Sequence, residues 1–160
     1  MNEIELYVHT AQHHDPKLIR IRQEASIGEL LGTALPESKE ELLVFLEEES
    51  DPLDHVRKLQ ECGVTNRRHV HCHHCHKIEV VVFYNGERRH SFSPSTTVEK
   101  VLLWALNAFH LKGSDALDKV LRLQSAPNEP LPEATHIGSL TDGVECQLRL
   151  DLTGKIDVNG

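Results

Sequence analysis

Hydrophobic and polar positions alternate along the first half of the chain in a way that predicts a hairpin followed by a helix. Residues 3–8 alternate as in a half-buried strand, and residues 17–23 alternate again and are expected to pair with them. Ser26 is a predicted helix N-cap, because Glu29 follows three residues later and completes a capping box. The apolar residues expected on the buried face of this helix are Ile27, Leu30, Leu31 and Ala34. Further strands are predicted at residues 42–46 and 64–71.

The second half of the chain repeats this order. Residues 78–82 begin a strand, and Asn85-Gly86 is a typical hairpin turn before the strand at residues 88–92. Thr96 or Thr97 is expected to cap a helix with a strong apolar stripe. Strands are then predicted at residues 119–123 and 145–150, with a short turn at residues 137–140 between them. Each half therefore predicts an α+β unit of about 75 residues, in which one helix packs on a mixed sheet.

A stretch rich in histidine and cysteine lies between the two halves. Residues 69–76, here called the His/Cys stretch, contain five histidines and two cysteines. No glycine or proline occurs between His69 and Phe83, so the chain is predicted to pass directly from the last strand of one domain to the first strand of the next. The expected domains are residues 1–74 and 75–152, followed by a flexible tail over residues 153–160.

Composition restricts the classes of partner. A formal net charge of -8 argues against nucleic-acid binding, which requires a basic face. No apolar segment approaches the length needed to span a bilayer, so no membrane association is expected. The four cysteines do not resemble a secreted disulfide framework. A cytoplasmic protein with reduced thiols is expected, in which Cys62 and Cys146 are small buried apolar residues.

The order of hairpin, helix, strand, loop and strand resembles the β-grasp fold of ubiquitin. Within it, Ile4-Glu5-Leu6 corresponds to Ile78-Glu79-Val80, and the helix start at Ser26 corresponds to that at Thr97. Two such units in tandem, ending in glycine, resemble the two-domain bacterial ubiquitin-like modifiers. In that group, as in this chain, a His-Val-His strand and a cysteine precede the first strand of the second domain.

The resemblance implies a function and a set of partners. Modifiers of this group are encoded with a ubiquitin-activating-like enzyme, a ubiquitin-conjugating-like enzyme and a JAB-type deconjugating metalloprotease in anti-phage operons. They are joined through their C-terminal glycine to a lysine of a target protein. No catalytic residues and no cofactor are expected, because the sequence holds no nucleophile motif and no Gly-rich phosphate loop after a strand. The alternatives are a tandem ubiquitin-like adaptor that is not conjugated, and a metal-binding protein that uses the His/Cys stretch.

The predicted conjugation site is Gly160, in a polar tail that includes Gly154, Val158 and Asn159. A glycine lacks a side chain and can pass through a narrow enzyme channel. Taken alone, a terminal glycine is weak evidence, because glycine is a common residue. Ubiquitin ends in two glycines that follow arginines, so an activating enzyme for this chain has to accept Asn159 next to the last glycine.

The His/Cys stretch offers possible metal ligands, but a strand places them unfavourably. Cys72 and Cys75 have the spacing of half a zinc site, and residues of an extended strand at this spacing point to opposite faces. We therefore expect no stoichiometric structural metal in these residues. The weak candidate ligands are Cys72, Cys75, His71, His73 and His76.

Strand parity also suggests a surface for partners. Val81 and Phe83 are expected on the outer face of the second sheet, together with Arg122 and Arg149. These residues are candidates for contacts with the activating enzyme. A solvated sheet surface without a partner is the alternative interpretation of the same pattern.

Overall fold

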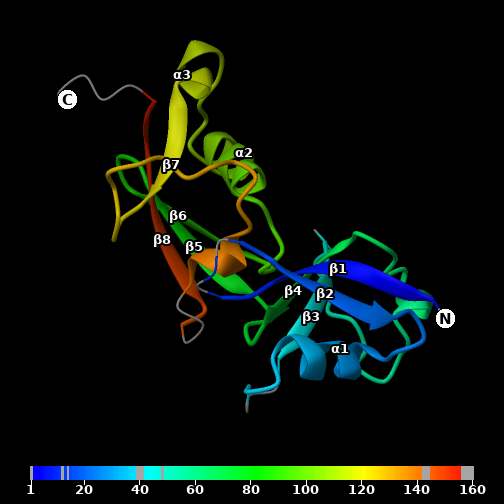
Figure 1. Ribbon diagram of the computed structural model, residues 1–160. Coiled ribbons are helices and arrows are strands. Elements are labelled where there is room, and N and C mark those ends of the chain that lie inside the picture. The colour runs from blue at the N-terminus through cyan, green and yellow to red at the C-terminus, as the bar shows by residue number, and fades with distance from the viewer. Residues whose placement is uncertain are drawn as a thin grey trace.

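The computed structural model describes residues 2–11, 13, 15–38, 42–47, 49–141 and 145–155. Its strands form two four-stranded sheets, with the orders β2-β1-β4-β3 and β6-β5-β8-β7 (Figure 1). The first half contains β1 (Glu3–His9), β2 (Lys17–Arg22), α1 (Ile27–Ala34), β3 (Leu43–Leu46), the 3-10 helix η1 (Gln60–Cys62) and β4 (His69–His73). The second half contains β5 (Ile78–Phe83), β6 (Glu87–Phe92), α2 (Val98–Ala108), α3 (Ser114–Leu117), β7 (Lys119–Leu123), the 3-10 helix η2 (Ile137–Leu140) and β8 (Gln147–Gly154).

The two sheets have the same topology. In each, the first two strands form an antiparallel hairpin, and the first strand also pairs in parallel with the last. The third strand pairs antiparallel with the last strand. This is the β-grasp arrangement, so the prediction of two tandem ubiquitin-like α+β domains is confirmed.

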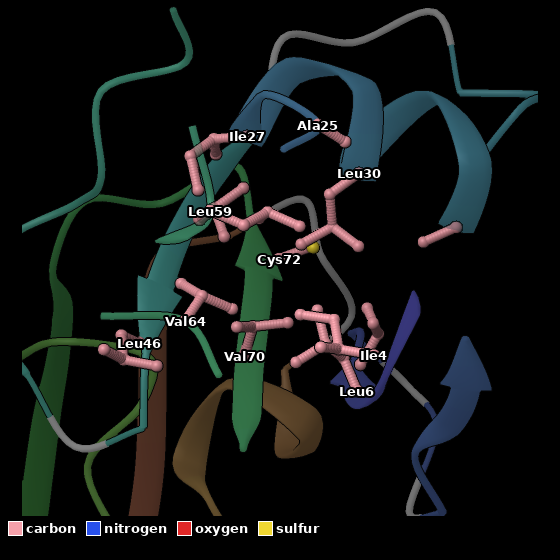
Figure 2. Close-up of a cluster of buried hydrophobic side chains, with 13 residues drawn as sticks. Ile4, Leu6, Ala25, Ile27, Leu30, Leu46, Leu59, Val64, Val70 and Cys72 are labelled. Atoms are coloured by element: carbon pink, nitrogen blue, oxygen red, sulfur yellow. The ribbon is translucent and has the colours of Figure 1, made fainter. Parts of the chain in front are cut away.

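An aliphatic core fills the space between α1 and the first sheet (Figure 2). Alternation in β1 places Ile4, Leu6 and Val8 in this core, where Val70 and Cys72 of β4 join them. The predicted cap of the helix is confirmed, since the backbone N–H of Glu29 donates to Ser26 Oγ at 3.1 Å. Local sequence and tertiary packing therefore agree in this domain.

The second domain has a similar core beneath a longer helix. Thr97 is the N-cap of α2, and its Oγ1 accepts from the backbone N–H of Lys100 at 3.4 Å. In the β5–β6 turn both central residues have positive φ, 47° at Asn85 and 126° at Gly86, which explains the Asn-Gly pair. The core residues from β5 and β8 alternate along their strands, as half-buried strands require: Ile78, Val80, Val82, Leu148, Leu150 and Leu152.

The last strand is longer than the sequence suggested. The expected end was Leu150, but β8 continues to Gly154, and its last residues pair with β7 as far as Gly154 opposite Lys119. Leu152 continues the buried alternation and is only 4% exposed, so hydrophobic burial extends the strand. Residues 152–154 thus belong to the sheet, which corrects the predicted start of the flexible tail at residue 153.

The segment between the two domains also differs from its prediction. The predicted strand at residues 64–71 begins only at His69, because Arg67 has a positive φ of 65° in a turn before it. Residues 74–77 then separate β4 from β5, so the strands do not follow one another directly. The helix α3 was not predicted from the sequence.

In the first domain, the face of the sheet opposite α1 is also buried. Phe45 of β3 is fully buried although it lies outside the aliphatic core, and its register partner on β4 is His71. Residues of the second half reach this face: Ser95 Oγ donates to the backbone oxygen of Glu49 at 2.8 Å, and the His136 ring lies 4.1 Å from the His71 ring. In Figure 1 the orange helix η2 lies where the two domains meet.

Replacing Phe45 tests this second buried layer. Phe45→Ala should lower the free energy of unfolding by about 3–5 kcal/mol, because it removes a large buried ring and leaves a cavity. Chemical denaturation of the full chain measures this loss. The control is Leu18→Ala on β2, where the side chain is 55% exposed and the expected loss is within about 0.5 kcal/mol. Equal effects of the two substitutions would mean that nothing packs on Phe45.

Candidate functional site

Three histidines from distant parts of the chain meet between the two domains. His9 lies at the end of β1, His71 in β4, and His136 immediately before η2. The ring centroids are 4.5 Å apart for His9 and His71, 4.1 Å for His71 and His136, and 5.1 Å for His9 and His136. Each ring offers one nitrogen to a group of three atoms that all lie within 4.8 Å of one another. We call these residues the histidine triad.

Hydrogen bonds orient two of these rings. His136 Nδ1 donates to the backbone oxygen of Ser95 at 2.7 Å, because a carbonyl oxygen can only accept. His9 Nε2 lies 2.8 Å from His69 Nδ1, so one of these nitrogens donates to the other. His71 Nε2 is buried without a hydrogen-bond partner among the described residues. An unpartnered buried nitrogen is uncommon in proteins.

Burial keeps His9 and His71 neutral. Desolvation, followed by the positive charge that His136 and then His69 would carry, lowers the pKa of His9 to about 4. The pKa of His71 is well below its ordinary value for the same reasons, with desolvation as the largest cause. Both rings are therefore unprotonated at neutral pH, and each has a nitrogen lone pair.

His73 connects the domains in a different way. The backbone N–H of Cys75 donates to His73 Nδ1 at 3.0 Å, which leaves the proton on Nε2. That Nε2 lies 2.8 Å from Thr141 Oγ1, and Thr141 Oγ1 itself donates to the backbone oxygen of Gly138. Burial, followed by the neighbouring His74, lowers the pKa of His73 to about 4. His73 is thus a neutral, fully hydrogen-bonded residue of the interface.

Gly138 is required at this contact. A Cβ atom built on Gly138 would lie 2.9 Å from Cβ of Pro94 and 3.3 Å from Cδ2 of His73. Any larger residue would force the η2 segment away from Pro94 and from the His73 ring. Glycine thus allows the η2 segment to pack closely on Pro94 of its own domain and against the His73 ring of the first domain.

The predicted tail residues lie at and beyond the end of β8. Gly154 is the last residue of the strand, and the backbone N–H of Lys155 donates to the backbone oxygen of Asp118 at 2.7 Å. Val158, Asn159 and Gly160 lie outside the described residues. The chain leaves the second sheet at the end that faces away from the first domain (Figure 1).

Comparison with known proteins agrees with this topology. Residues 79–155 match the family model described as BilA ubiquitin-like domain 2. The chain is a two-domain ubiquitin-like protein. Among solved structures, the ubiquitin of Caldiarchaeum subterraneum matches with a TM-score of 0.39 and 16% identity, over 52% of this chain and 99% of that one. No curated protein matches the chain in sequence. No helix in the described part of the chain is long and apolar enough to cross a membrane.

The outer face of the second ubiquitin-like domain only partly resembles the expected partner surface. Val81 is fully buried, which corrects its prediction as an outward contact. It lies in register between Arg89 of β6 and Arg149 of β8. Arg149 is exposed and its guanidinium lies 5.9 Å from the centre of the Phe83 ring.

Arg122 on the same domain is already engaged within the chain. Its Nε donates to Thr153 Oγ1 at 2.9 Å, and its NH1 nitrogen donates to the backbone oxygen of Pro127 at 3.2 Å. This side chain therefore fixes the end of β8 against the neighbouring loop. The accessible part of the predicted surface consists of Arg149 and the partly exposed Phe83.

The cysteines of the His/Cys stretch do not act together. Cys72 belongs to the first core, where burial raises the pKa of its thiol to about 12. Cys75 forms a disulfide with Cys146, across a Cα–Cα distance of 5.7 Å. The expectation of reduced thiols is wrong for Cys75 and Cys146, and holds for Cys62 and Cys72. The expectation of a buried apolar Cys146 is also wrong, because an exposed Cys146 lies immediately before β8, alongside the chain segment before β5. Of the remaining weak candidates, His76 is exposed and only His71 belongs to the triad.

Thiol labelling tests this arrangement of cysteines. In the native oxidised chain Cys62, which is partly exposed, should react with an alkylating reagent, whereas buried Cys72 should not. The raised pKa of Cys72 keeps its thiol protonated and therefore unreactive. Unfolding without reductant should expose two reactive thiols, Cys62 and Cys72, and unfolding with reductant should expose all four. Mass spectrometry of the labelled chain gives the count.

The disulfide should also contribute to stability. Its partners are 71 residues apart in sequence, and loop-closure entropy alone gives a stabilisation of about 4 kcal/mol for a bridge of this span. Cys146→Ser should therefore lower the free energy of unfolding under oxidising conditions and change it little under reducing conditions. Cys62→Ser is the matched control. Four reactive thiols in the unreduced, unfolded chain would contradict the bridge.

Proposed function

We propose that this chain is a ubiquitin-like protein modifier, activated at Gly160 and conjugated to a lysine of a target protein. The observation that carries the proposal is the β-grasp domain over residues 79–155, matched by a ubiquitin-like family model and followed directly by the glycine-ended segment. A ubiquitin-like fold typically serves as a non-enzymatic modifier, on which other enzymes act.

The position of the exit from β8 supports this function. The five residues after Lys155, if fully extended, would reach about 17 Å from the sheet. This reach would allow the carboxylate of Gly160 to enter an enzyme channel while both folded domains stay outside. The exit lies at the end of the second domain away from the first, so the first domain does not obstruct it (Figure 1).

The proposed chemistry uses only the terminal carboxylate of this chain. In the activating enzyme the carboxylate oxygen of Gly160 attacks the α-phosphate of ATP, and pyrophosphate leaves. A cysteine thiolate of the enzyme then attacks the acyl-adenylate, and AMP leaves as the thioester forms. A target lysine finally displaces the thiol and forms an isopeptide bond. Glycine suits each step because no side chain crowds the reacting carbonyl.

The partners follow from the family resemblance. They are an activating-like enzyme, a conjugating-like enzyme and a JAB-type deconjugating metalloprotease, which would also generate the Gly160 end from any longer precursor. Anti-phage defence is the proposed setting. Enzymes of the ubiquitin-conjugation type would recognise the second domain next to the tail, and exposed Arg149 beside Phe83 is the proposed contact with the activating enzyme.

The decisive experiment measures thioester formation with the activating enzyme encoded beside this chain. The intact chain and a chain that ends at Asn159 are each incubated with enzyme, ATP and magnesium, and the thioester is detected on non-reducing gels. Removal of Gly160 should abolish the thioester, because the enzyme channel and active site are built for a terminal glycine. Circular dichroism should show that both chains are folded.

Asn159→Ala is the matched control for this truncation. It alters the tail next to the reacting residue but keeps the terminal glycine, so it should still form a thioester. An adaptor that is not conjugated predicts that neither chain forms one. Equal reaction of the intact and truncated chains, or no reaction of either, would contradict the modifier proposal.

A further inference from the structure

We propose that the histidine triad, His9, His71 and His136, forms a site for a divalent transition-metal ion that joins the two domains. His9 and His71 come from β1 and β4 of the first domain, and His136 comes from the segment before η2 of the second. The inference does not depend on conjugation at Gly160. Because it uses His71, it departs from the expectation that the His/Cys stretch holds no metal.

The spacing of the three rings suits a common ion. One nitrogen of each ring lies within 4.8 Å of a nitrogen of each of the other two. A tetrahedral zinc site with Zn–N bonds of about 2.0–2.1 Å requires ligand nitrogens roughly 3.3 Å apart. Binding would therefore require the three rings to bring these nitrogens closer together.

The hydrogen bonds of the triad are those of metal-ligating histidines. Such residues usually donate from one ring nitrogen to a fixed acceptor and bind the ion through the other. His136 Nδ1 donates to the backbone oxygen of Ser95, which leaves Nε2 as the ligand atom. If His9 Nε2 donates to His69 Nδ1, 2.8 Å away, then Nδ1 of His9 holds the lone pair.

His71 provides the independent evidence for a missing ligand. Its side chain is only 3% exposed, and its Nε2 has no hydrogen-bond partner in the described part of the chain. A folded protein rarely leaves such an atom unsatisfied, unless water or an ion occupies the neighbouring position. A metal ion between His71 and the other two rings would satisfy it.

The surroundings allow a fourth ligand. A pocket lined by His9, His136, Glu47 and Glu99, among others, opens beside the triad. Water from this pocket could complete a four-coordinate site, as in other zinc sites with three histidines. Imidazole ligands favour zinc and neighbouring transition metals, and disfavour magnesium and calcium.

The second cluster of possible ligands is less suitable. His73, His74 and Cys75 also lie close together. However, the Cys75 sulfur is bonded to Cys146, and His73 uses both ring nitrogens in hydrogen bonds. The triad is therefore the site at which the free lone pairs converge.

Metal titration of the untagged, full-length chain tests the proposal. The protein is prepared without a metal-affinity step and treated with a chelator, and zinc is then added in the presence of a competing chromophoric chelator. We expect one zinc per chain and a higher unfolding temperature, because the ion binds the folded state in preference to the unfolded chain. Cobalt in place of zinc should give the visible absorption bands of a tetrahedral site.

Two substitutions separate the triad from the exposed histidines. His136→Asn keeps an amide that can donate to Ser95 but removes the ligand atom. It should weaken zinc binding by at least about 100-fold, because replacing a residue that only supports a metal ligand already costs about 10- to 100-fold. His76→Asn removes an exposed histidine of the His/Cys stretch and should change affinity less than about twofold. His9→Gln repeats the test if His136→Asn does not fold.

Three results would overturn the proposal. The first is a wild-type chain that binds no zinc above background. The second is a folded His136→Asn or His9→Gln chain that binds zinc as tightly as wild type. The third is an equal loss of affinity in His76→Asn, which would assign the binding to the exposed histidines.

Discussion

The alternation of β4 determines how the two domains are joined. Val70 and Cys72 point into the core under α1, so His69, His71 and His73 must lie on the opposite face of the sheet. In an isolated β-grasp domain that face would be free to meet solvent. Here the second domain covers it, and His71 and His73 are both buried.

The interface that results is polar, and its polar groups are mostly paired. His73 is bonded on both nitrogens, and Ser95 accepts from His136 while its hydroxyl donates to Glu49. Close packing at Gly138 keeps these bonds in place. His71 Nε2 is the exception at the centre of this network. The proposed metal ion would complete the interface at that point.

The arrangement separates the junction between the domains from the proposed conjugation tail. The junction lies at one end of the second domain, and β8 ends at the other, where the chain leaves the sheet at Lys155. An enzyme could therefore engage the proposed conjugation tail without disturbing the contact between the domains. The disulfide between Cys75 and Cys146 secures the start of β8 on the side of the junction.

Local sequence alone determined the fold of each domain. Period-two alternation in β1, β5 and β8, the Ser26 and Thr97 caps and the Asn85-Gly86 turn are short-range signals, and the structure contains all of them. The likeness of the two halves also followed from these signals. The predicted tail at Gly160 stays a prediction, because it lies outside the described residues.

Only the tertiary structure decided which side chains meet. The parallel pairing of β1 with β4 places His9 beside His71. The presence of histidines in both strands is the sequence signal from which this contact could have been predicted. No local pattern marks His136, which is 65 positions beyond His71 in the sequence. The burial of Val81 and the pairing of Cys75 with Cys146 likewise depend on strands that are distant in sequence. Alternation specifies which face a residue occupies, but only the packing of the two domains determines what covers that face.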